Sequence, residues 1–213
     1  MSVPASQRAP LHRCLRYFAR LAGILFFGLR CHGRHRLPKE GAVLVCANHQ
    51  SYLDPIFVGL TLDRPINYVA RQSLFEVRPI AWLINLLSSI PIHRDGMGLA
   101  GLKECLRRLK QGEMVLIFPE GTRSLDGNVT PLKPGFCMLA RRGKVSLLPV
   151  GLDGAYDAWP RSAKLPRRAR IHIVVGEAIP PDVVKELDDR TLVAELEQRI
   201  RECHAWARSG RQR

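Results

Sequence analysis

The chain has 213 residues, which suffices for one domain with a substantial apolar core and no need of disulfide or metal support. Lysine and arginine number 33 against 19 acidic residues, so the net charge is +14 and the pI is about 10.2. This excess excludes a preference for cationic partners and favours nucleic acid, anionic lipid or an acidic carrier protein.

The first recognisable element is an amphipathic helix near the N-terminus. Residues 1–10 show no periodicity and are expected to be disordered, and after them apolar residues recur at three- and four-residue steps opposite several arginines. The apolar positions are Leu11, Leu15, Phe18, Ala22, Leu25, Phe26 and Leu29, and the arginines are Arg13, Arg16 and Arg20. Such a helix either docks on its own domain or lies in an anionic membrane surface.

The apolar run inside this helix, Leu21–Leu29, is too short to cross a membrane. It has nine residues, whereas a spanning helix needs about 20. Arginines follow the run where a signal peptide would carry a cleavage site with small residues. We therefore predict a chain associated with the cytoplasmic face of a membrane, with residues 1–37 as tail and membrane-binding helix and residues 38–213 as the folded domain.

The cysteines indicate neither a metal centre nor a disulfide framework. The six cysteines, at positions 14, 31, 46, 105, 137 and 203, form no C-x-x-C pair and have no zinc-ligand spacing. His32 and His35 beside Cys31 fit a basic linker better than a metal site. We expect reduced cysteines that mostly pack in the core, and no bound metal.

Short apolar runs then alternate with helical patterns. The predicted strands are Ala42–Ala47, Ile66–Ala70, Ile90–His93, Met114–Phe118, Val145–Val150 and Ile171–Val175. The predicted helices cover residues 55–62, 79–87, 97–111, 134–142 and 191–208. This alternation is typical of an α/β fold, a single domain with a mostly parallel sheet flanked by helices and with functional side chains at the carboxyl ends of the strands.

A histidine and an aspartate follow the first of these strands. In Asn48-His49-Gln50-Ser51-Tyr52-Leu53-Asp54-Pro55, the carboxylate comes about one helical turn after the imidazole. Histidine can take a proton from a hydroxyl, and a carboxylate can fix its tautomer and stabilise the imidazolium. This is the logic of a catalytic triad without a serine, so the attacking hydroxyl would belong to the substrate.

The same residues have a structural interpretation. Asp54 can cap a helix that begins at Pro55, or it can form a capping box with Ser51 while His49 merely packs. Capping and catalysis are compatible, because one carboxylate oxygen can serve the helix while the other serves His49.

A second polar turn follows the strand Met114–Phe118. Its residues Glu120, Gly121, Thr122 and Arg123 combine a sharp bend with hydroxyl and guanidinium groups suited to an anion such as phosphate. Glu120 can also accept hydrogen bonds from glycerol-like hydroxyls. The alternative is an ordinary polar turn with a surface ion pair.

Arg94 follows the strand Ile90–His93 and would add a second guanidinium at the same sheet edge. Two arginines converging on one cleft suit a phosphate dianion. The alternative is a surface ion pair between Arg94 and its neighbour Asp95.

Together these segments resemble the four ordered motifs of the glycerophospholipid acyltransferases, in the lysophosphatidic acid acyltransferase branch. The matching segments are Asn48-His49 with Asp54, Ile92-His93-Arg94, Phe118-Pro119-Glu120-Gly121-Thr122-Arg123-Ser124 and Leu147-Leu148-Pro149-Val150. The resemblance spans about residues 38 to 180 and makes residues 38–213 the acyltransferase domain.

The resemblance implies a role for each matching residue. His49 would be the general base and Asp54 its orienting partner. Arg94 and Arg123 would bind the acceptor phosphate, while Glu120 and Gly121 would help to hold the glycerol portion. Many relatives carry a lysine facing the phosphate where this chain has Arg71 and Gln72, and Arg71 would substitute for it.

The implied reaction moves a fatty acyl group from acyl-CoA or acyl-ACP, used as a co-substrate without any other cofactor, to the free hydroxyl of lysophosphatidic acid. Another glycerophosphate or lysophospholipid acceptor is the alternative within this class. The expected partners are an anionic lipid membrane surface, a glycerophosphate-type acceptor and the acyl carrier.

Two interpretations from other classes compete with this one. Residues 96–101 spell G-x-G-x-x-G, a dinucleotide-binding pattern, but Arg94 and Asp95 separate it from the preceding strand. The basic charge would also suit a lipid- or nucleic-acid-binding module, although no aromatic interleaving or helix-turn-helix pattern accompanies it. We therefore expect no nucleic-acid partner.

Overall fold

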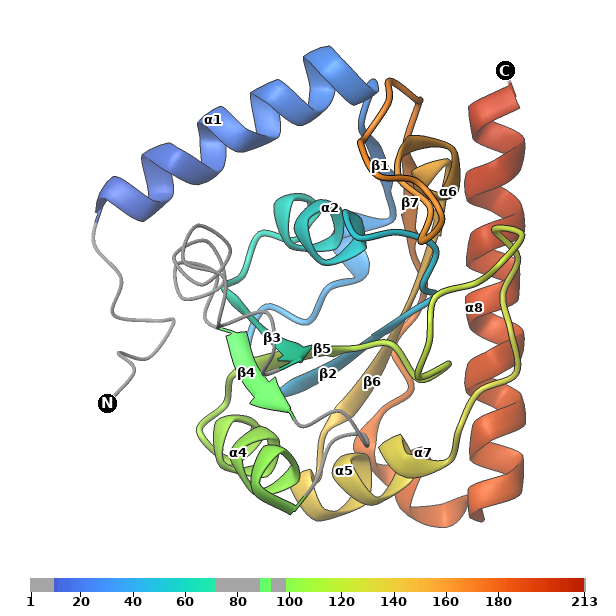
Figure 1. Cartoon of the computed structure of the whole chain (residues 1–213). Coiled ribbons are helices and arrows are strands. Elements are labelled where there is room, and N and C mark those ends of the chain that lie inside the picture. The colour runs from blue at the N-terminus through green and yellow to red at the C-terminus, as the bar shows by residue number, and fades with distance from the viewer. Residues whose placement is uncertain (1–9, 72–88, 93–98, 213) are drawn as a thin grey trace.

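A computed structural model describes residues 10–71, 89–92 and 99–212. Its seven-stranded sheet has the order β1-β7-β6-β2-β5-β3-β4, and every neighbouring pair is parallel except β6 and β7 (Figure 1). The strands are β1 (Arg30–His32), β2 (Val43–Ala47), β3 (Ile66–Arg71), β4 (Ser89–Ile92), β5 (Met114–Ile117), β6 (Ser146–Asp153) and β7 (His172–Val175). The mostly parallel sheet predicted from the sequence is confirmed.

Helices cover both faces of the sheet. They are α1 (Pro10–Phe27), the 3-10 helix η2 (Arg34–Arg36), α2 (Asp54–Thr61), α4 (Leu99–Lys110), α5 (Gly135–Gly143), α6 (Ala155–Ala158), α7 (Pro181–Glu186) and α8 (Asp189–Gln212). The period-two alternation of β2 sends Val43 and Val45 into the core beneath α2, and Leu44 and Cys46 into the core beneath α4, α5 and α8. Two buried faces explain why β2 is apolar throughout.

The predicted elements agree with the observed ones apart from their ends and a few short pieces. All six predicted strands are present, β6 continues three residues further to Asp153, and α8 is longer at both ends than predicted. The predicted helix over residues 79–87 lies outside the described residues. The apolar pattern of the sequence does not predict β1, η2, α6 and α7, because three to six residues are too few to show a period.

The N-terminal helix α1 forms as predicted, and between residues 17 and 27, where its side chains are described, most of the large apolar ones are exposed to solvent. Its exposed residues include Tyr17, Phe18, Leu21, Ile24, Leu25 and Phe26. Its last residue, Phe27, packs edge-on against Phe57 of α2 with ring centroids 5.1 Å apart. Among the helices that the structure describes, none is long and apolar enough to span a bilayer.

The segment between α1 and β2 is more than a linker. Residues 30–32 form the edge strand β1 and pair in parallel with β7, and Arg34–Arg36 form η2. The basic linker expected around His32 and His35 therefore contributes to the sheet. The division of the chain at residues 37 and 38 stays a prediction.

Candidate active site

His49 and Asp54 lie side by side at the carboxyl end of β2. The loop from Asn48 to Leu53 leaves the strand and turns back into α2, so the ring of His49 meets the first residue of that helix. His49 Nδ1 is 2.7 Å from Asp54 Oδ2, and the Asp54 side chain is fully buried. The pairing proposed from their spacing is present.

One oxygen of Asp54 accepts every hydrogen bond that this carboxylate receives from the described residues. Besides the imidazole, Oδ2 accepts the backbone N–H groups of Gln50 at 2.6 Å and Ser51 at 2.7 Å. The helix α2 begins at Asp54 with Leu53 as its N-cap and no side-chain cap hydrogen bond, so neither the Asp54 cap nor the capping box with Ser51 forms. Oδ1 is buried and has no hydrogen-bond partner in the described part of the chain. The two oxygens therefore do not bind separately, one to the helix and one to His49, as the sequence suggested.

Because the carboxylate accepts at Nδ1, the neutral ring carries its proton on that atom and leaves Nε2 as the basic nitrogen. Nε2 has no hydrogen-bond partner among the described residues, and the side chain is 19 % exposed. His49 also stacks on Phe118, with ring centroids 4.0 Å apart and planes 16° apart. The ring is thus held by a carboxylate at one nitrogen and open at the other, as a general base requires.

The second predicted motif, which follows β5, is bonded directly to the first. His49 donates its backbone N–H to Glu120 Oε1 at 2.7 Å, and the carbonyl of His49 accepts the N–H of Ser124 at 2.7 Å. These bonds connect positions about 70 residues apart in the chain. They fix the backbone on both sides of the imidazole.

Glu120 is buried among donors. Its second carboxylate oxygen accepts the backbone N–H of Thr130 at 3.0 Å and also the hydroxyl of that residue. Burial raises the pKa of the Glu120 carboxyl, and the hydrogen bonds from Thr130 and His49 oppose that rise. The carboxylate is only 2 % exposed, so these contacts make it a support for the His49 backbone. Contact between Glu120 and an acceptor hydroxyl stays a prediction.

Arg123 reaches back to the His49 loop. Its guanidinium carbon lies 3.5 Å from the ring centroid of Tyr52, and that ring in turn lies 5.3 Å from the ring of Trp159. Nη1 of Arg123 is buried without a hydrogen-bond partner in the described residues. A stacked guanidinium with unused donors is arranged to accept an anion.

Gly121 has a positive φ of 72°, which favours glycine and closes the turn through its N–H bond to the Phe118 carbonyl. A Cβ at this position would lie 3.0 Å from Nζ of Lys133. Lys133 is exposed and makes no ion pair with any described carboxylate. No sequence pattern singles out this lysine, because it lies ten residues beyond Arg123 in a loop without periodicity.

The structure describes the remaining predicted residues to different extents. Thr122 is exposed beside Arg123, and its side chain makes no hydrogen bond within the described ranges. Arg71 ends β3 on the side of the sheet where β2 ends, but its side chain lies outside the described residues. Arg94, Asp95 and the first three residues of the G-x-G-x-x-G pattern, 96–98, also lie outside them, while its last three begin α4. The fourth motif is buried in β6, where Pro149 pairs with Cys46.

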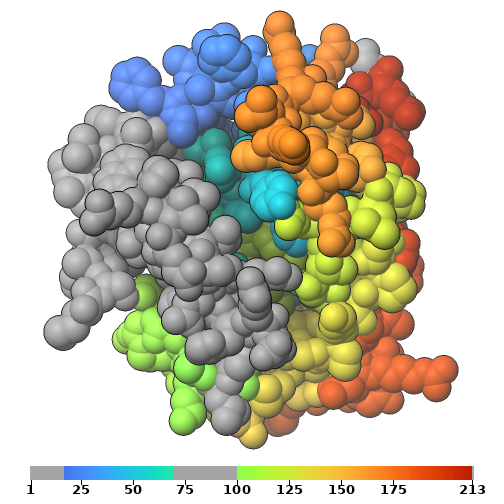
Figure 2. Space-filling model, viewed as in Figure 1, coloured from blue at the N-terminus to red at the C-terminus, as the bar shows by residue number. Residues whose placement is uncertain are grey.

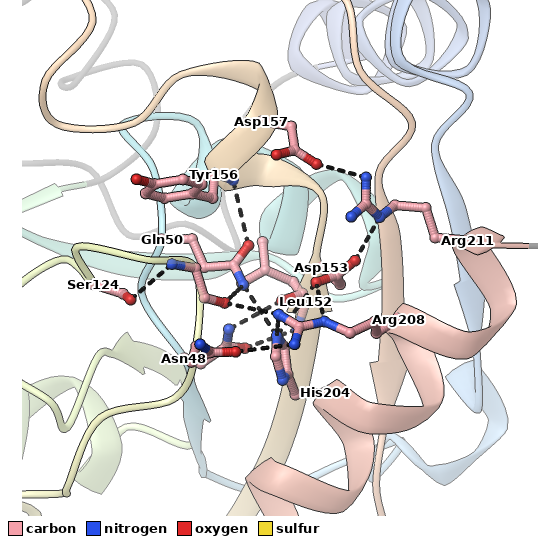
Figure 3. Close-up of polar contacts among 12 residues, drawn as sticks. Asn48, Gln50, Ser124, Leu152, Asp153, Tyr156, Asp157, His204, Arg208 and Arg211 are labelled. Atoms are coloured by element: carbon pink, nitrogen blue, oxygen red, sulfur yellow. Dashed lines mark hydrogen bonds and ion pairs between the residues drawn. The ribbon is translucent and has the colours of Figure 1, made fainter.

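Asn48 and Gln50, which flank His49, belong to a buried polar network (Figure 3). The side-chain amide of Asn48 bonds Leu152 of β6 in both directions, at 3.0 and 2.8 Å. Gln50 donates to the Gly127 carbonyl, and its Nε2 lies 3.1 Å from Nε2 of His204 on α8. The two neighbours of His49 are thus each attached to a distant element.

The end of α8 completes this network with charge. His204, Arg208 and Arg211 surround Asp153 at the end of β6, and Arg208 also donates to Asn128 Oδ1 at 2.9 Å (Figure 3). Burial raises the pKa of the Asp153 carboxyl. The hydrogen bond with His204, the charge of Arg211 and the hydrogen bonds from Arg208 and Arg211 outweigh burial and lower that pKa to about 2.

The site opens at one face of the molecule. In Figure 2 the cyan surface near residue 50 lies in a recess between α1 in blue and the orange segment around residue 165. Tyr52 of the His49 loop is 45 % exposed, although most of that loop is buried. A substrate can therefore approach the histidine from this face.

Comparisons with known proteins also indicate an acyltransferase. The family model described as acyltransferase matches residues 28–153. The 1-acyl-sn-glycerol-3-phosphate acyltransferase of Bacillus subtilis is 29 % identical, and the match covers 82 % of this chain and 87 % of that protein. The protein of the same name from Pseudomonas aeruginosa is 30 % identical, with 87 % and 68 % covered. A relative from Chlamydomonas reinhardtii is 34 % identical over 74 % of this chain, which spans about half of that protein (48 %).

The fold agrees with a solved structure as well. The crystal structure of the 1-acyl-sn-glycerophosphate (LPA) acyltransferase PlsC from Thermotoga maritima superimposes with a TM-score of 0.78 at 26 % identity, covering 90 % of this chain and 77 % of that one. The resemblance indicated by the motifs is confirmed. Since the family model matches more than half of its residues, this chain belongs to the acyltransferase family.

Proposed function

We propose that this acyltransferase moves a fatty acyl group from a thioester to the free hydroxyl of 1-acyl-sn-glycerol 3-phosphate and so forms phosphatidic acid. The names of its relatives supply the acceptor. The observation that carries the chemistry is the 2.7 Å contact between His49 Nδ1 and Asp54 Oδ2, with Nε2 left open.

In the proposed reaction the acceptor hydroxyl gives its proton to Nε2 of His49 as its oxygen attacks the thioester carbonyl. Asp54 stabilises the imidazolium through Nδ1–H. When the tetrahedral intermediate collapses, the carbon–sulfur bond breaks and the imidazolium returns the proton to the departing thiolate. The ester and the free thiol are the products, and the enzyme forms no covalent intermediate.

The phosphate of the acceptor would lie against the cations beside the Gly121 turn. Arg123 offers its stacked guanidinium with a free Nη1, and Lys133 offers an ammonium near Gly121. Arg94 is assigned to the same phosphate by its motif position, and Arg71 is assigned to it as the substitute for the lysine that many relatives carry there. Thr122 would add a hydroxyl donor, while Glu120 holds the backbone of His49 in place.

The donor would be acyl-CoA or acyl-ACP, since both carriers are anionic and suit a chain with a net charge of +14. No cofactor takes part in the proposed transfer. The exposed apolar stripe of α1 would bind the cytoplasmic face of a membrane, where both the acceptor and the product reside.

The test measures thiol release from an acyl thioester with and without lysophosphatidic acid, for wild type and His49→Ala. The wild type should release thiol only with the acceptor, and the variant should lose at least about 10³-fold in rate because the base is absent. His35→Ala removes an exposed histidine outside the site and serves as the matched control. A His49→Ala enzyme with a near-normal rate would remove His49 from the mechanism.

A further inference from the structure

A basic loop connects α6 to β7 and has no role in the chemistry proposed above. This basic loop comprises residues 159–170 and contains five basic residues and no acidic one. The basic residues are all exposed: Arg161, Lys164, Arg167, Arg168 and Arg170. Leu165 lies among them and is 78 % exposed. A cationic loop with an apolar residue at its centre combines two features of a membrane-binding surface.

One end of the basic loop lies at the active site. The carbonyl of Trp159 accepts the hydroxyl of Ser51 at 2.7 Å, three residues before Asp54. The ring of Trp159 lies 5.3 Å from that of Tyr52, on which Arg123 stacks. The loop therefore starts beside the proposed phosphate-binding residues.

The other end of the basic loop is attached to α1. The backbone N–H of Ile171, directly after the loop, donates to the Phe27 carbonyl at the end of α1 at 2.9 Å. Arg170 also lies near Gly28, where a Cβ would be 3.6 Å from the arginine Cγ. The exposed apolar stripe of α1 and the basic loop are thus held together and flank the same recess (Figure 2).

We propose that the basic loop is a second membrane anchor, which binds the head groups of anionic lipids while α1 inserts its apolar stripe. Bound at both places, the bilayer would face the recess above His49. The proposal rests on the proposed function, because a lipid acceptor explains why the site should face a bilayer. A nucleic acid would match the charge of the loop but would leave Leu165 and the α1 stripe exposed to water.

The test compares two triple variants of the full chain that remove the same positive charge. Arg161→Gln/Lys164→Gln/Arg168→Gln changes the basic loop at residues that make no hydrogen bond or ion pair within the described ranges. The control, Lys103→Gln/Lys110→Gln/Arg142→Gln, changes similarly exposed residues on α4 and α5, far from α1 (Figure 1). Sedimentation is measured with vesicles of phosphatidylcholine alone and of equal parts phosphatidylcholine and phosphatidylglycerol.

The loop variant should bind the anionic vesicles about 100-fold more weakly than wild type, since each basic residue near such a surface contributes about 1 kcal/mol and tenfold is about 1.4 kcal/mol. The control should lose much less, and binding to phosphatidylcholine alone should not distinguish the variants. Equal losses in both variants, or unchanged binding of the loop variant, would overturn the proposal. If the loop variant lost binding to DNA but bound the anionic vesicles as wild type does, the loop would be a nucleic-acid-binding surface. That result would overturn the proposal as well.

Thiol release with a short-chain acceptor in the absence of vesicles separates this inference from the proposed function. Wild type and both triple variants should react equally, because none of the changed residues lies in the site. Should the wild type release no thiol, the proposed function fails, while the vesicle comparison still decides the role of the loop.

Discussion

At the scale of single residues, the candidate site contains some buried polar atoms that make several hydrogen bonds and others that make none within the described residues. Asp54 receives three hydrogen bonds on one oxygen, and Arg123 keeps a buried nitrogen without a partner in the described residues. Unpaired buried donors are unfavourable unless a ligand satisfies them. The fold therefore holds Asp54 as a fixed acceptor, and the buried Nη1 of Arg123 is a donor that a bound anion would satisfy under the proposed function.

Asp54→Asn should keep the fold and lose most of the activity. The amide cannot accept from the imidazole and from two backbone N–H groups on one atom with the strength of a carboxylate, so His49 loses its tautomer and orientation. We expect kcat to fall by about 10³- to 10⁴-fold. Steady-state kinetics would show this, with Asp182→Asn, an exposed aspartate on α7, as control. A variant with a normal kcat would show that Asp54 only shapes the loop.

Arg123→Ala and Lys133→Gln should each raise the KM for lysophosphatidic acid. Hydrogen bonds to charged groups contribute about 1.5–3 kcal/mol, which corresponds to roughly 10- to 100-fold. The KM for the thioester should change little, because neither cation is assigned to the donor. Kinetics with each substrate varied in turn measures both values. An increase confined to the donor KM would move these cations to the carrier.

At the scale of elements, α8 lies directly on β6 and allows no additional atoms between them. Gly151 of β6 faces the backbone of α8 at Cys203 and His204, and a Cβ there would overlap their backbone atoms. The close approach brings the last turns of α8 to Asp153 and to the loop that contains Gly127. A glycine in a strand thus permits the helix to reach the active-site loops.

Gly151→Ala should destabilise the protein by about 3 kcal/mol or more, because α8 must move away from β6. Gly135→Ala is the matched control: it adds the same methyl group at the start of α5, where no heavy atom lies within 4 Å of the new Cβ. The control should be neutral or slightly stabilising, since alanine favours helix. Urea unfolding compares the two variants, and equal effects would contradict the packing explanation.

At the scale of the whole molecule, charges from distant segments meet at Asp153. The carboxylate joins the end of β6 to Arg208 and Arg211 near the C-terminus, while Arg208 also holds the loop at Asn128. The His49 loop is attached to the same network through Gln50 and His204. Stability and the geometry of the site are therefore coupled through one buried carboxylate.

This coupling predicts a pH dependence. The pKa of Asp153 is lowered from 3.8 to about 2, so its stabilising contribution is complete above pH of about 4 and is lost as the pH falls through 2. The free energy of unfolding of wild type should exceed that of Asp153→Asn at pH 7, and the difference should shrink between about pH 4 and 2. Urea titrations across this range measure it, and a difference independent of pH would contradict the ion-pair explanation.

The sequence by itself determined most of the secondary structure, the α/β class and the motif residues His49, Asp54, Glu120 and Arg123. It could do so because apolar periodicity and short motifs are local properties. Only the tertiary structure decided how these residues are held. Gln50 and His204 are 154 positions apart, Glu120 and His49 are 71 apart, and Lys133 approaches Gly121 across a turn. Such contacts depend on which strands become neighbours in the sheet, which no local pattern specifies.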